Sequence, residues 1–230
     1  MSNTNTNNPP ASLRWLVTLG PTHEPIDQVR FIGNRSSGRM GFEIAQAAKA
    51  MGAHVRILAG PCSLPKINSW TDLARFQTAS DLRGLLTEAW SNFDVLIMAA
   101  AVADWRVVGA AHGGKIRRDA TPPTLQLEPV AEILGNVRSR DNQFVVGFAL
   151  EPKDEVIASA RRKLVAKEAD CIVANSLQTL DCVNSDAQIV WPDGRVISLD
   201  AFGGVAPKSA VAKWIVAAIS PAIAQKCRNR

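Results

Sequence analysis

Two serines, two glycines and two arginines lie within eight residues of one another in the segment NRSSGRMG, from Asn34 to Gly41. This segment directly precedes an apolar stretch with helical spacing. Unpaired backbone N–H groups and the positive end of a helix dipole favour an anion at such a position. The segment therefore predicts a site for a phosphate-bearing ligand. The alternative, more frequent for such a stretch alone, is a helix entry whose serines only cap their own backbone.

A run of small residues, AAAVADW, ends the most apolar part of the chain at 99–105. Small side chains let a flat ligand approach the backbone, and Asp104 can accept hydrogen bonds from an amine or a hydroxyl. The alternative interpretation is a tightly packed strand end in which Asp104 caps a helix.

Basic residues in two other segments can serve a polyphosphate. Lys163 and Lys167 are four residues apart and share one face of a predicted helix, which follows the strand that carries Phe148. Lys115 lies in a predicted surface flap, 109–123, that could close over a ligand. Exposed lysines are usually only solvated. A binding role is inferred for these residues only because they are expected to lie at the same crevice.

The elements that must position these residues alternate between short apolar runs and helical stretches. Strands are predicted over 14–20, 54–60, 94–103, 144–151 and 170–175, helices over 41–52, 78–90, 154–168 and 208–224, and a hairpin with an Asp-Gly turn over 188–199. The predicted fold class is α/β, with a Rossmann-like, doubly wound, mostly parallel sheet and a C-terminal β-hairpin. Ligands of such sheets bind beyond the carboxyl ends of the strands, where the long loop 20–41 is expected.

Length and composition predict one large domain over 13–230, preceded by a polar, disordered N-terminus over 1–12. The net charge of +5 is modest and scattered, which argues against nucleic acid. No signal peptide or membrane-spanning run is found, so we expect a cytoplasmic protein without a membrane partner. The four cysteines show no metal-binding spacing, and we expect reduced thiols and no metal site.

Oxidoreductases of the short-chain dehydrogenase class have the same fold class and are the main rival. They need a glycine fingerprint and a tyrosine four residues before a catalytic lysine. This chain has no tyrosine, Ser159 stands four residues before Lys163, and neither GxGxxG nor GxxxxGK[ST] occurs. These absences argue against the oxidoreductase.

Five segments resemble, in the same order, those of the phosphopantothenoylcysteine synthetase (phosphopantothenate–cysteine ligase) family. They are EPIDQVRFIGNRSSGRMG, AAAVAD, GKIRR, VVGFALE and KLVAKEADCIVANS. The resemblance implies a ligase of coenzyme A biosynthesis that joins 4′-phosphopantothenate to L-cysteine. It implies an acyl-nucleotidylate intermediate, with CTP favoured over ATP, Mg²⁺ with the nucleotide, and release of pyrophosphate and nucleoside monophosphate. It also implies a homodimer. Since no flavin-dependent decarboxylase half is present, we expect a free-standing ligase without flavin and a separate decarboxylase partner.

The resemblance assigns roles to individual residues. Asn34 would act on the acyl group, and Lys115 would be the second catalytic residue. Ser36, Ser37 and Gly38 would line the phosphopantothenate side. The nucleotide would contact Met98, Ala99, Ala100, Asp104, Lys115, Ala131, Glu132, Ile133, Leu134, Phe148, Lys163 and Lys167.

Three departures from the family pattern bear on these roles. Gly-Gly-Thr-Arg after the first strand becomes Gly-Pro-Thr-His at 20–23, which changes the backbone donors. Asn-Pro-Asp-Ile-Leu becomes Val-Ala-Glu-Ile-Leu at 130–134, which leaves the base preference open. A lysine becomes Arg39, which keeps the charge. The altered 130–134 segment also keeps a second alternative open, a nucleotide-binding module without catalysis.

Overall fold

The computed structural model describes residues 13–110, 114–116, 124–137, 141–199 and 201–227. The predicted disordered N-terminus over 1–12 and most of the predicted flap over 109–123 lie outside the described residues.

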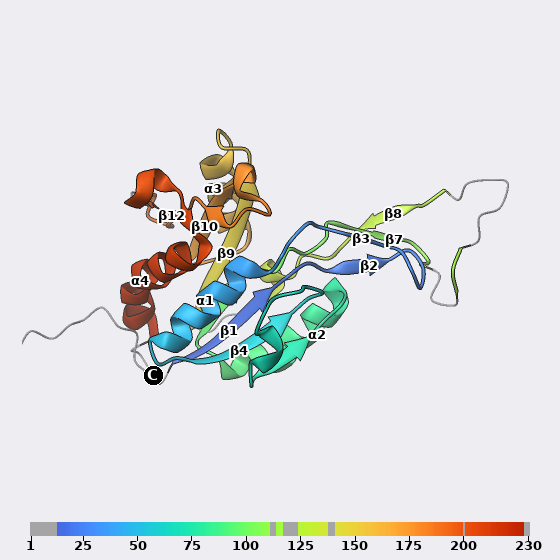
Figure 1. The fold of residues 1–230 in the computed structure, drawn as a ribbon, viewed down its shortest axis with the longest axis horizontal. Helices are drawn as coiled ribbons and strands as arrows, with labels where there is room; N and C mark the ends of the chain where they lie inside the picture. The colour runs from blue at the N-terminus through green and yellow to red at the C-terminus, as the bar shows by residue number, and fades with distance from the viewer. Residues whose placement is uncertain (1–12, 111–113, 117–123, 138–140, 200, 228–230) are drawn as a thin grey trace, which may run out of the picture.

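One eight-stranded sheet forms the centre of the body (Figure 1), in the order β13-β12-β10-β9-β6-β1-β4-β5. Its strands are β1 (Arg14–Leu19), β4 (His54–Ala59), β5 (Leu73–Arg75), β6 (Val95–Met98), β9 (Phe144–Glu151), β10 (Cys171–Ser176), β12 (Gln188–Val190) and β13 (Val196–Ser198). The six strands from β10 to β5 are parallel, and the hairpin β12–β13 joins β10 antiparallel. The predicted mostly parallel, doubly wound α/β fold with a C-terminal hairpin is confirmed.

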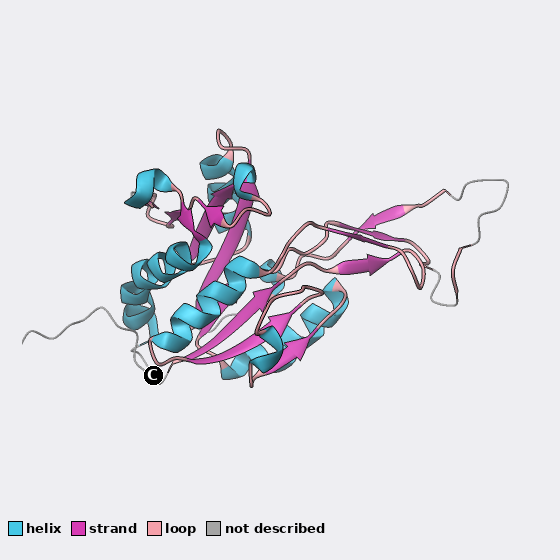
Figure 2. Cartoon of the chain, in the orientation of Figure 1, coloured by secondary structure: helices cyan, strands magenta, loops and turns pink. Residues whose placement is uncertain are grey.

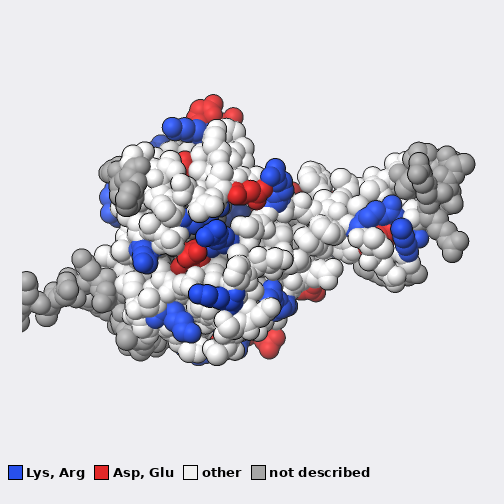
Figure 3. All heavy atoms as spheres, viewed as in Figure 1, with Lys and Arg blue, Asp and Glu red and all other residues white. Residues whose placement is uncertain are grey.

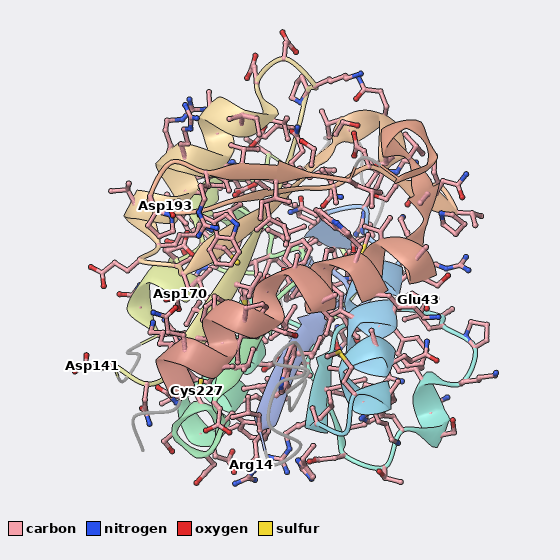
Figure 4. The ribbon with its side chains drawn as sticks, turned by 90° about the vertical axis from the view of Figure 1, so that its left-hand side faces the viewer. Arg14, Glu43, Asp141, Asp170, Asp193 and Cys227 are labelled. Atoms are coloured by element: carbon pink, nitrogen blue, oxygen red, sulfur yellow. The ribbon has the colours of Figure 1, made fainter. Side chains whose placement is uncertain are left out.

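Helices cover both faces of this sheet (Figure 2). They are α1 (Arg39–Ala50), α2 (Ala79–Ala89), α3 (Val156–Ala166) and α4 (Lys208–Cys227). Alternate residues of β1 point to opposite faces: Trp15 packs in the core beneath α1 and α4, whereas Leu16 packs with α2 and α3. Figure 4 looks onto the first of these faces, where α1 and α4 lie side by side.

Four short strands form an arm that projects from the body (Figure 1). The arm consists of two antiparallel pairs, β2 (His23–Pro25) with β3 (Phe31–Gly33), and β7 (Trp105–Val107) with β8 (Leu127–Pro129). The sequence did not predict these strands, because three residues are too few for apolar alternation to be recognised. The same holds for the small pair β11 (Asn184–Ser185) and β14 (Ala206–Pro207).

The remaining elements are short 3₁₀ helices over Ile67–Ser69, Trp90–Asn92, Leu134–Asn136, Leu177–Thr179 and Ala201–Gly204. No helix within the described ranges is long and apolar enough to cross a membrane. None of the four cysteines, all of which are described, forms a disulfide.

Candidate functional site

A crevice of about 900 Å³ opens beyond the carboxyl ends of the parallel strands. It lies where the strand order reverses between β1 and β6, which is where open α/β sheets bind ligands. Its walls are the segments 33–41, 98–104, 130–134, 148–151 and 179–181, together with Lys163, Lys167, Asn175, Ser185 and Lys208. Figure 3 shows basic and acidic side chains intermingled on the body near the base of the arm.

The loop before α1 supplies one wall of the crevice. The N-cap of α1 is Gly38 with φ +70°, and no side chain caps the helix there. A Cβ on Gly38 would lie 3.0 Å from Leu19 Cδ1, and one on Gly41 would lie 2.7 Å from Leu19 Cβ, so both glycines let the helix start pack against β1. The hydroxyls of Ser36 and Ser37 accept from backbone N–H groups only at 3.3 and 3.4 Å. The serines therefore make long local hydrogen bonds to their own loop, but neither of them caps α1.

Asn34 joins this loop to the end of β6. Its side-chain amide donates to the carbonyl oxygen of Val102 at 2.7 Å, and the residue is exposed to the crevice. Two threonines fix the same strand end from beneath. The N–H of Ala100 donates to Thr18 Oγ1 at 3.1 Å, and the N–H of Ala103 donates to Thr22 Oγ1 at 2.9 Å. The Asn34 amide therefore has a fixed position above the small residues.

Asp104 does not cap a helix. The strand β7 follows it, its side chain is exposed at the crevice, and its backbone carbonyl accepts from Val130 N–H at 2.9 Å. The interpretation of Asp104 as a helix cap is therefore wrong, because the chain turns into the arm instead.

Lys163 and Lys167 line the crevice from α3 and its C-cap, and both have carboxylate partners. Lys163 Nζ donates to Glu151 Oε1 at 2.9 Å, and this bond lowers the pKa of Glu151. Lys167 Nζ lies 3.3 Å from Glu132 Oε2. Glu132 belongs to the segment that departs from the family pattern, so the altered segment directly contacts a proposed nucleotide lysine.

Most of the other residues predicted to contact the nucleotide line the crevice, but Lys115 does not. Those that line the crevice are Met98, Ala99, Ala100, Ala131, Glu132, Ile133, Leu134 and Phe148. Lys115 does not line it, because residues 114–116 run along the arm. There the buried carboxylate of Asp27 accepts a hydrogen bond from Ile116 N–H at 3.0 Å. The same carboxylate pairs with Arg30, and this pair lowers the pKa of Asp27.

The departure at 20–23 has a structural consequence. Pro21 lacks an N–H and bridges to Ala101, while Thr22 N–H donates to Ala101 O at 3.1 Å. His23, where the family has arginine, stacks on Phe31 with ring centroids 3.6 Å apart, and burial lowers its pKa. This segment therefore leads into the arm, where His23 begins β2 and stacks on Phe31 instead of presenting a cation.

Two charged residues that the sequence did not single out also line the crevice, Asp181 and Lys208, together with Arg35 of the predicted anion-binding loop. Arg35 and Asp181 form an ion pair across it. Lys208 is 8% exposed and is the first residue of α4. The available signal was a cation at a helix start, where the dipole disfavours positive charge. Among the described residues no group of three His, Cys, Asp or Glu side chains could hold a metal ion.

Comparison with protein families matches residues 11–222 to the DNA/pantothenate metabolism flavoprotein C-terminal domain. The C-terminal domain of a coenzyme A biosynthesis bifunctional protein CoaBC, known from its crystal structure, is similar in fold. Its TM-score is 0.75 at 33% sequence identity, with 93% of this chain and 96% of that chain covered.

Two curated relatives are longer proteins. A cysteine/cysteine sulfinic acid decarboxylase from an unknown prokaryotic organism is 42% identical over 168 residues, which cover 72% of this chain and 46% of the relative. The coenzyme A biosynthesis bifunctional protein CoaBC of Escherichia coli (strain K12) is 35% identical over 198 residues, which cover 82% and 48%. The chain thus spans about half the length of the curated relatives it matches.

Proposed function

Because this chain belongs to the family of the DNA/pantothenate metabolism flavoprotein C-terminal domain, we propose that it is a phosphopantothenate–cysteine ligase of coenzyme A biosynthesis. The observation that carries the proposal is one crevice that is lined by the Asn34 amide together with the basic residues Arg39, Lys163, Lys167 and Lys208. Such a crevice suits two phosphate-bearing substrates that must meet at one reacting group.

The proposed reaction has two steps. The carboxylate of 4′-phosphopantothenate attacks the α-phosphorus of a nucleoside triphosphate, and the bond to pyrophosphate breaks. The amine of cysteine then attacks the acyl carbon, loses a proton, and expels the nucleoside monophosphate. No redox change occurs, so the reaction requires no flavin.

Asn34 is the residue we assign to the acyl group. One N–H of its amide is held by Val102, which leaves the second N–H to donate to the carbonyl oxygen as charge develops there. Ser36, Ser37 and Gly38 would contact phosphopantothenate in the same wall. The fixed position of Asn34 supports this role, because a preorganised donor needs no rearrangement during the reaction.

The nucleotide is assigned to the side of α3. Lys163 and Lys167 would bind the triphosphate, and the small strand end with Asp104 and Phe148 would hold the rest. Mg²⁺ is expected to enter with the nucleotide as part of the substrate, because Mg²⁺ commonly binds through substrate phosphates and water. CTP is the favoured nucleotide by family resemblance, with ATP as the alternative.

The arm is assigned to a homodimer. Phe31 and Trp105 on the arm are 50% and 51% exposed, which is a high exposure for large apolar side chains. A second copy paired there would cover them and bring Lys115 to the partner's crevice. Leu127→Asp on the arm is expected to give a monomer in analytical ultracentrifugation, whereas Val165→Asp on the exposed face of α3 keeps the dimer. A dimer of both variants would contradict this assignment.

The direct test is to incubate the pure protein with phosphopantothenate, cysteine and Mg²⁺, with CTP and ATP in parallel. We expect amide product and pyrophosphate, with CTP the better substrate. No amide with either nucleotide would refute the ligase, and nucleotide binding without turnover would favour the binding module. A decarboxylase that acts on the product is an expected partner, for which co-purification is the test.

A further inference from the structure

The arm (Figure 1) contains a buried carboxylate, that of Asp27, in the turn between β2 and β3. Its side chain is 0% exposed, whereas the next three residues of the turn, 28–30, are all exposed. A charged side chain is rarely buried unless it is fully paired. The partners of Asp27 therefore indicate what its burial stabilises.

The two oxygens of this carboxylate have different partners. Oδ1 accepts hydrogen bonds from the backbone N–H groups of Val29 and Arg30, both at 2.8 Å. These two bonds close the turn, and a turn of this kind needs no second oxygen. Oδ2 instead accepts from the N–H of Ile116 at 3.0 Å and from Nε of Arg30 at 3.0 Å. One oxygen thus shapes the turn, and the other holds the segment 114–116, which is distant in the sequence.

The held segment is fixed on both sides of Lys115. Before the lysine, the carbonyl oxygen of Gly114 accepts from Gln28 N–H at 3.4 Å. After it, Ile116 donates its N–H to the carboxylate, and its carbonyl oxygen accepts from Arg30 Nη2 at 2.9 Å. Lys115 itself is exposed. The backbone is therefore fixed while the lysine stays accessible, which suits a side chain that is presented to a ligand.

The guanidinium of Arg30 keeps this carboxylate ionised. Its hydrogen bond holds the pKa of Asp27 well below the ordinary range, so the acceptor is present throughout the neutral range of pH. The carboxylate and the guanidinium together hold both backbone polar groups of Ile116. Hydrogen bonds to ionised groups are stronger than neutral ones, so the segment is fixed by strong bonds.

The proposed function gives the position of Lys115 a chemical consequence. Attack of a carboxylate on the α-phosphorus brings negative charges together, and a lysine lowers the barrier only if its ammonium meets the developing charge. A displacement of about 1 Å can cost about two orders of magnitude in rate. Because Lys115 lies on an arm that projects from the body, the bonds of the arm itself must fix its backbone.

We propose that Asp27 is a positioning residue for Lys115. Its Oδ2 fixes the backbone of 114–116 and so sets how the Lys115 ammonium reaches into the partner's crevice. The inference rests on the proposed function, since that function gives Lys115 a reacting group to serve. The rival role of Asp27 is purely structural, with a carboxylate that only closes the turn.

The test is the variant Asp27→Asn in the full chain. Asparagine keeps Oδ1 as the acceptor that closes the turn but replaces Oδ2 by an NH₂ group, which cannot accept from Ile116 or Arg30. We expect kcat for amide formation to fall about 10- to 30-fold, with the KM for phosphopantothenate within about twofold of the wild type. Glu128→Gln, which neutralises an exposed carboxylate elsewhere on the arm, is the matched control and leaves kcat unchanged.

Two further readouts distinguish positioning from a structural role. Amide hydrogen exchange measured by NMR should be faster at Ile116 in Asp27→Asn and unchanged at Val29, because only the bond to Oδ2 is lost. In a double-mutant cycle, Lys115→Met alone should lower kcat about 100-fold. Adding Asp27→Asn should lower it no further, because the residue that Asp27 positions is already absent.

A second variant removes the same hydrogen bond from the other side. Ile116→Pro has no N–H to donate and leaves Asp27 and its turn in place, so the same loss of kcat is expected even if Asp27→Asn does not fold.

The outcomes separate this inference from the proposed function. A wild type that forms no amide overturns the function and the inference together. Amide formation by the wild type, with full activity of Asp27→Asn and Ile116→Pro or of Lys115→Met, overturns only the inference. Losses that multiply in the double mutant, or faster exchange at Val29 as well as at Ile116, also overturn it, because Asp27 would then act on the turn rather than on Lys115.

Discussion

The two basic regions of the crevice differ in how their charge is balanced. On the side of α3, Lys163 and Lys167 are paired with Glu151 and Glu132. On the side of α1 and α4, Lys208 lines the crevice, is buried and has no such partner among the described residues. We assign Lys208 to phosphopantothenate, together with Ser36, Ser37 and Gly38. A paired lysine keeps its geometry in the empty protein and must exchange partners when a ligand binds. An unpaired buried lysine gains its first partner from the ligand, so we expect it to contribute more per charge.

The largest effect is expected where the two regions meet. Asn34→Ala should lower the rate of amide formation about 100- to 1,000-fold, because it removes a preorganised donor to the developing charge. Nucleotide affinity should stay unchanged, since Asn34 belongs to neither basic region. Steady-state kinetics and nucleotide titration on the same preparation measure both quantities. Equal losses in rate and nucleotide affinity would contradict the role of Asn34.

The second effect is a pH dependence of phosphopantothenate affinity. It distinguishes the region of Lys208, which has no carboxylate partner among the described residues, from the region of Lys163 and Lys167, which are paired. Because burial lowers the pKa of Lys208 below the ordinary 10.5, its ammonium loses its proton at a lower pH than a surface lysine. The groups that face it are Arg39, Asp181 and Cys182. Phosphopantothenate affinity should therefore fall as pH rises, beginning below pH 10.5. Binding of the Lys208→Arg variant should not show this fall, because arginine stays protonated. An identical alkaline profile for both proteins would count against the assignment.

The third effect concerns the paired region. Lys167→Met should raise the KM for the nucleotide about 10-fold through loss of a charge-assisted contact. The KM for phosphopantothenate should not change, because that substrate is assigned to the other side. Initial rates with each substrate varied in turn give both constants. A rise in the phosphopantothenate KM alone would reverse the assignment of the two sides.

The smallest effect on nucleotide affinity is expected when the carboxylate that pairs with Lys167 is neutralised. Glu132→Gln keeps the shape of the side chain and removes the charge that holds Lys167, so the nucleotide should bind about two- to fivefold more tightly. The factor is small because the Glu132 side chain is 50% exposed. Glu128→Gln, which removes a carboxylate from an exposed pair on the arm, is the matched control. Weaker nucleotide binding by Glu132→Gln would contradict this prediction, because the contact of Glu132 with the nucleotide would then outweigh its hold on Lys167.

The sheet and its helices could be predicted because their signals are long or chemically specific. The most apolar part of the chain contains β6, whose four residues are all buried and which is central in the sheet. The helix predicted over 78–90 is α2, whose start is fixed by a reciprocal capping box between Thr78 and Asp81. The arm had no such signal, because strands of three residues carry no recognisable period.

The sequence predicted which segments form the candidate site, but not which of their side chains contact one another. The loop at 34–41, the strand end at 99–104 and the lysines of α3 all line one crevice. The partners of those lysines could not be read from the sequence, since ion pairs between distant segments depend on the packed fold. Lys208 was missed because a lysine at the start of an apolar helix resembles an ordinary helix end. Lys115 was assigned to the nucleotide without a means to see that the arm carries it away from its own crevice.

The division of the crevice is tested most directly by phosphorus NMR on the complex of the protein with phosphopantothenate and a non-hydrolysable CTP analogue. Lys208→Met should shift the monoester resonance and leave the three nucleotide resonances in place. A shift of the nucleotide resonances with an unchanged monoester signal would contradict the account, because Lys208 would then serve the triphosphate.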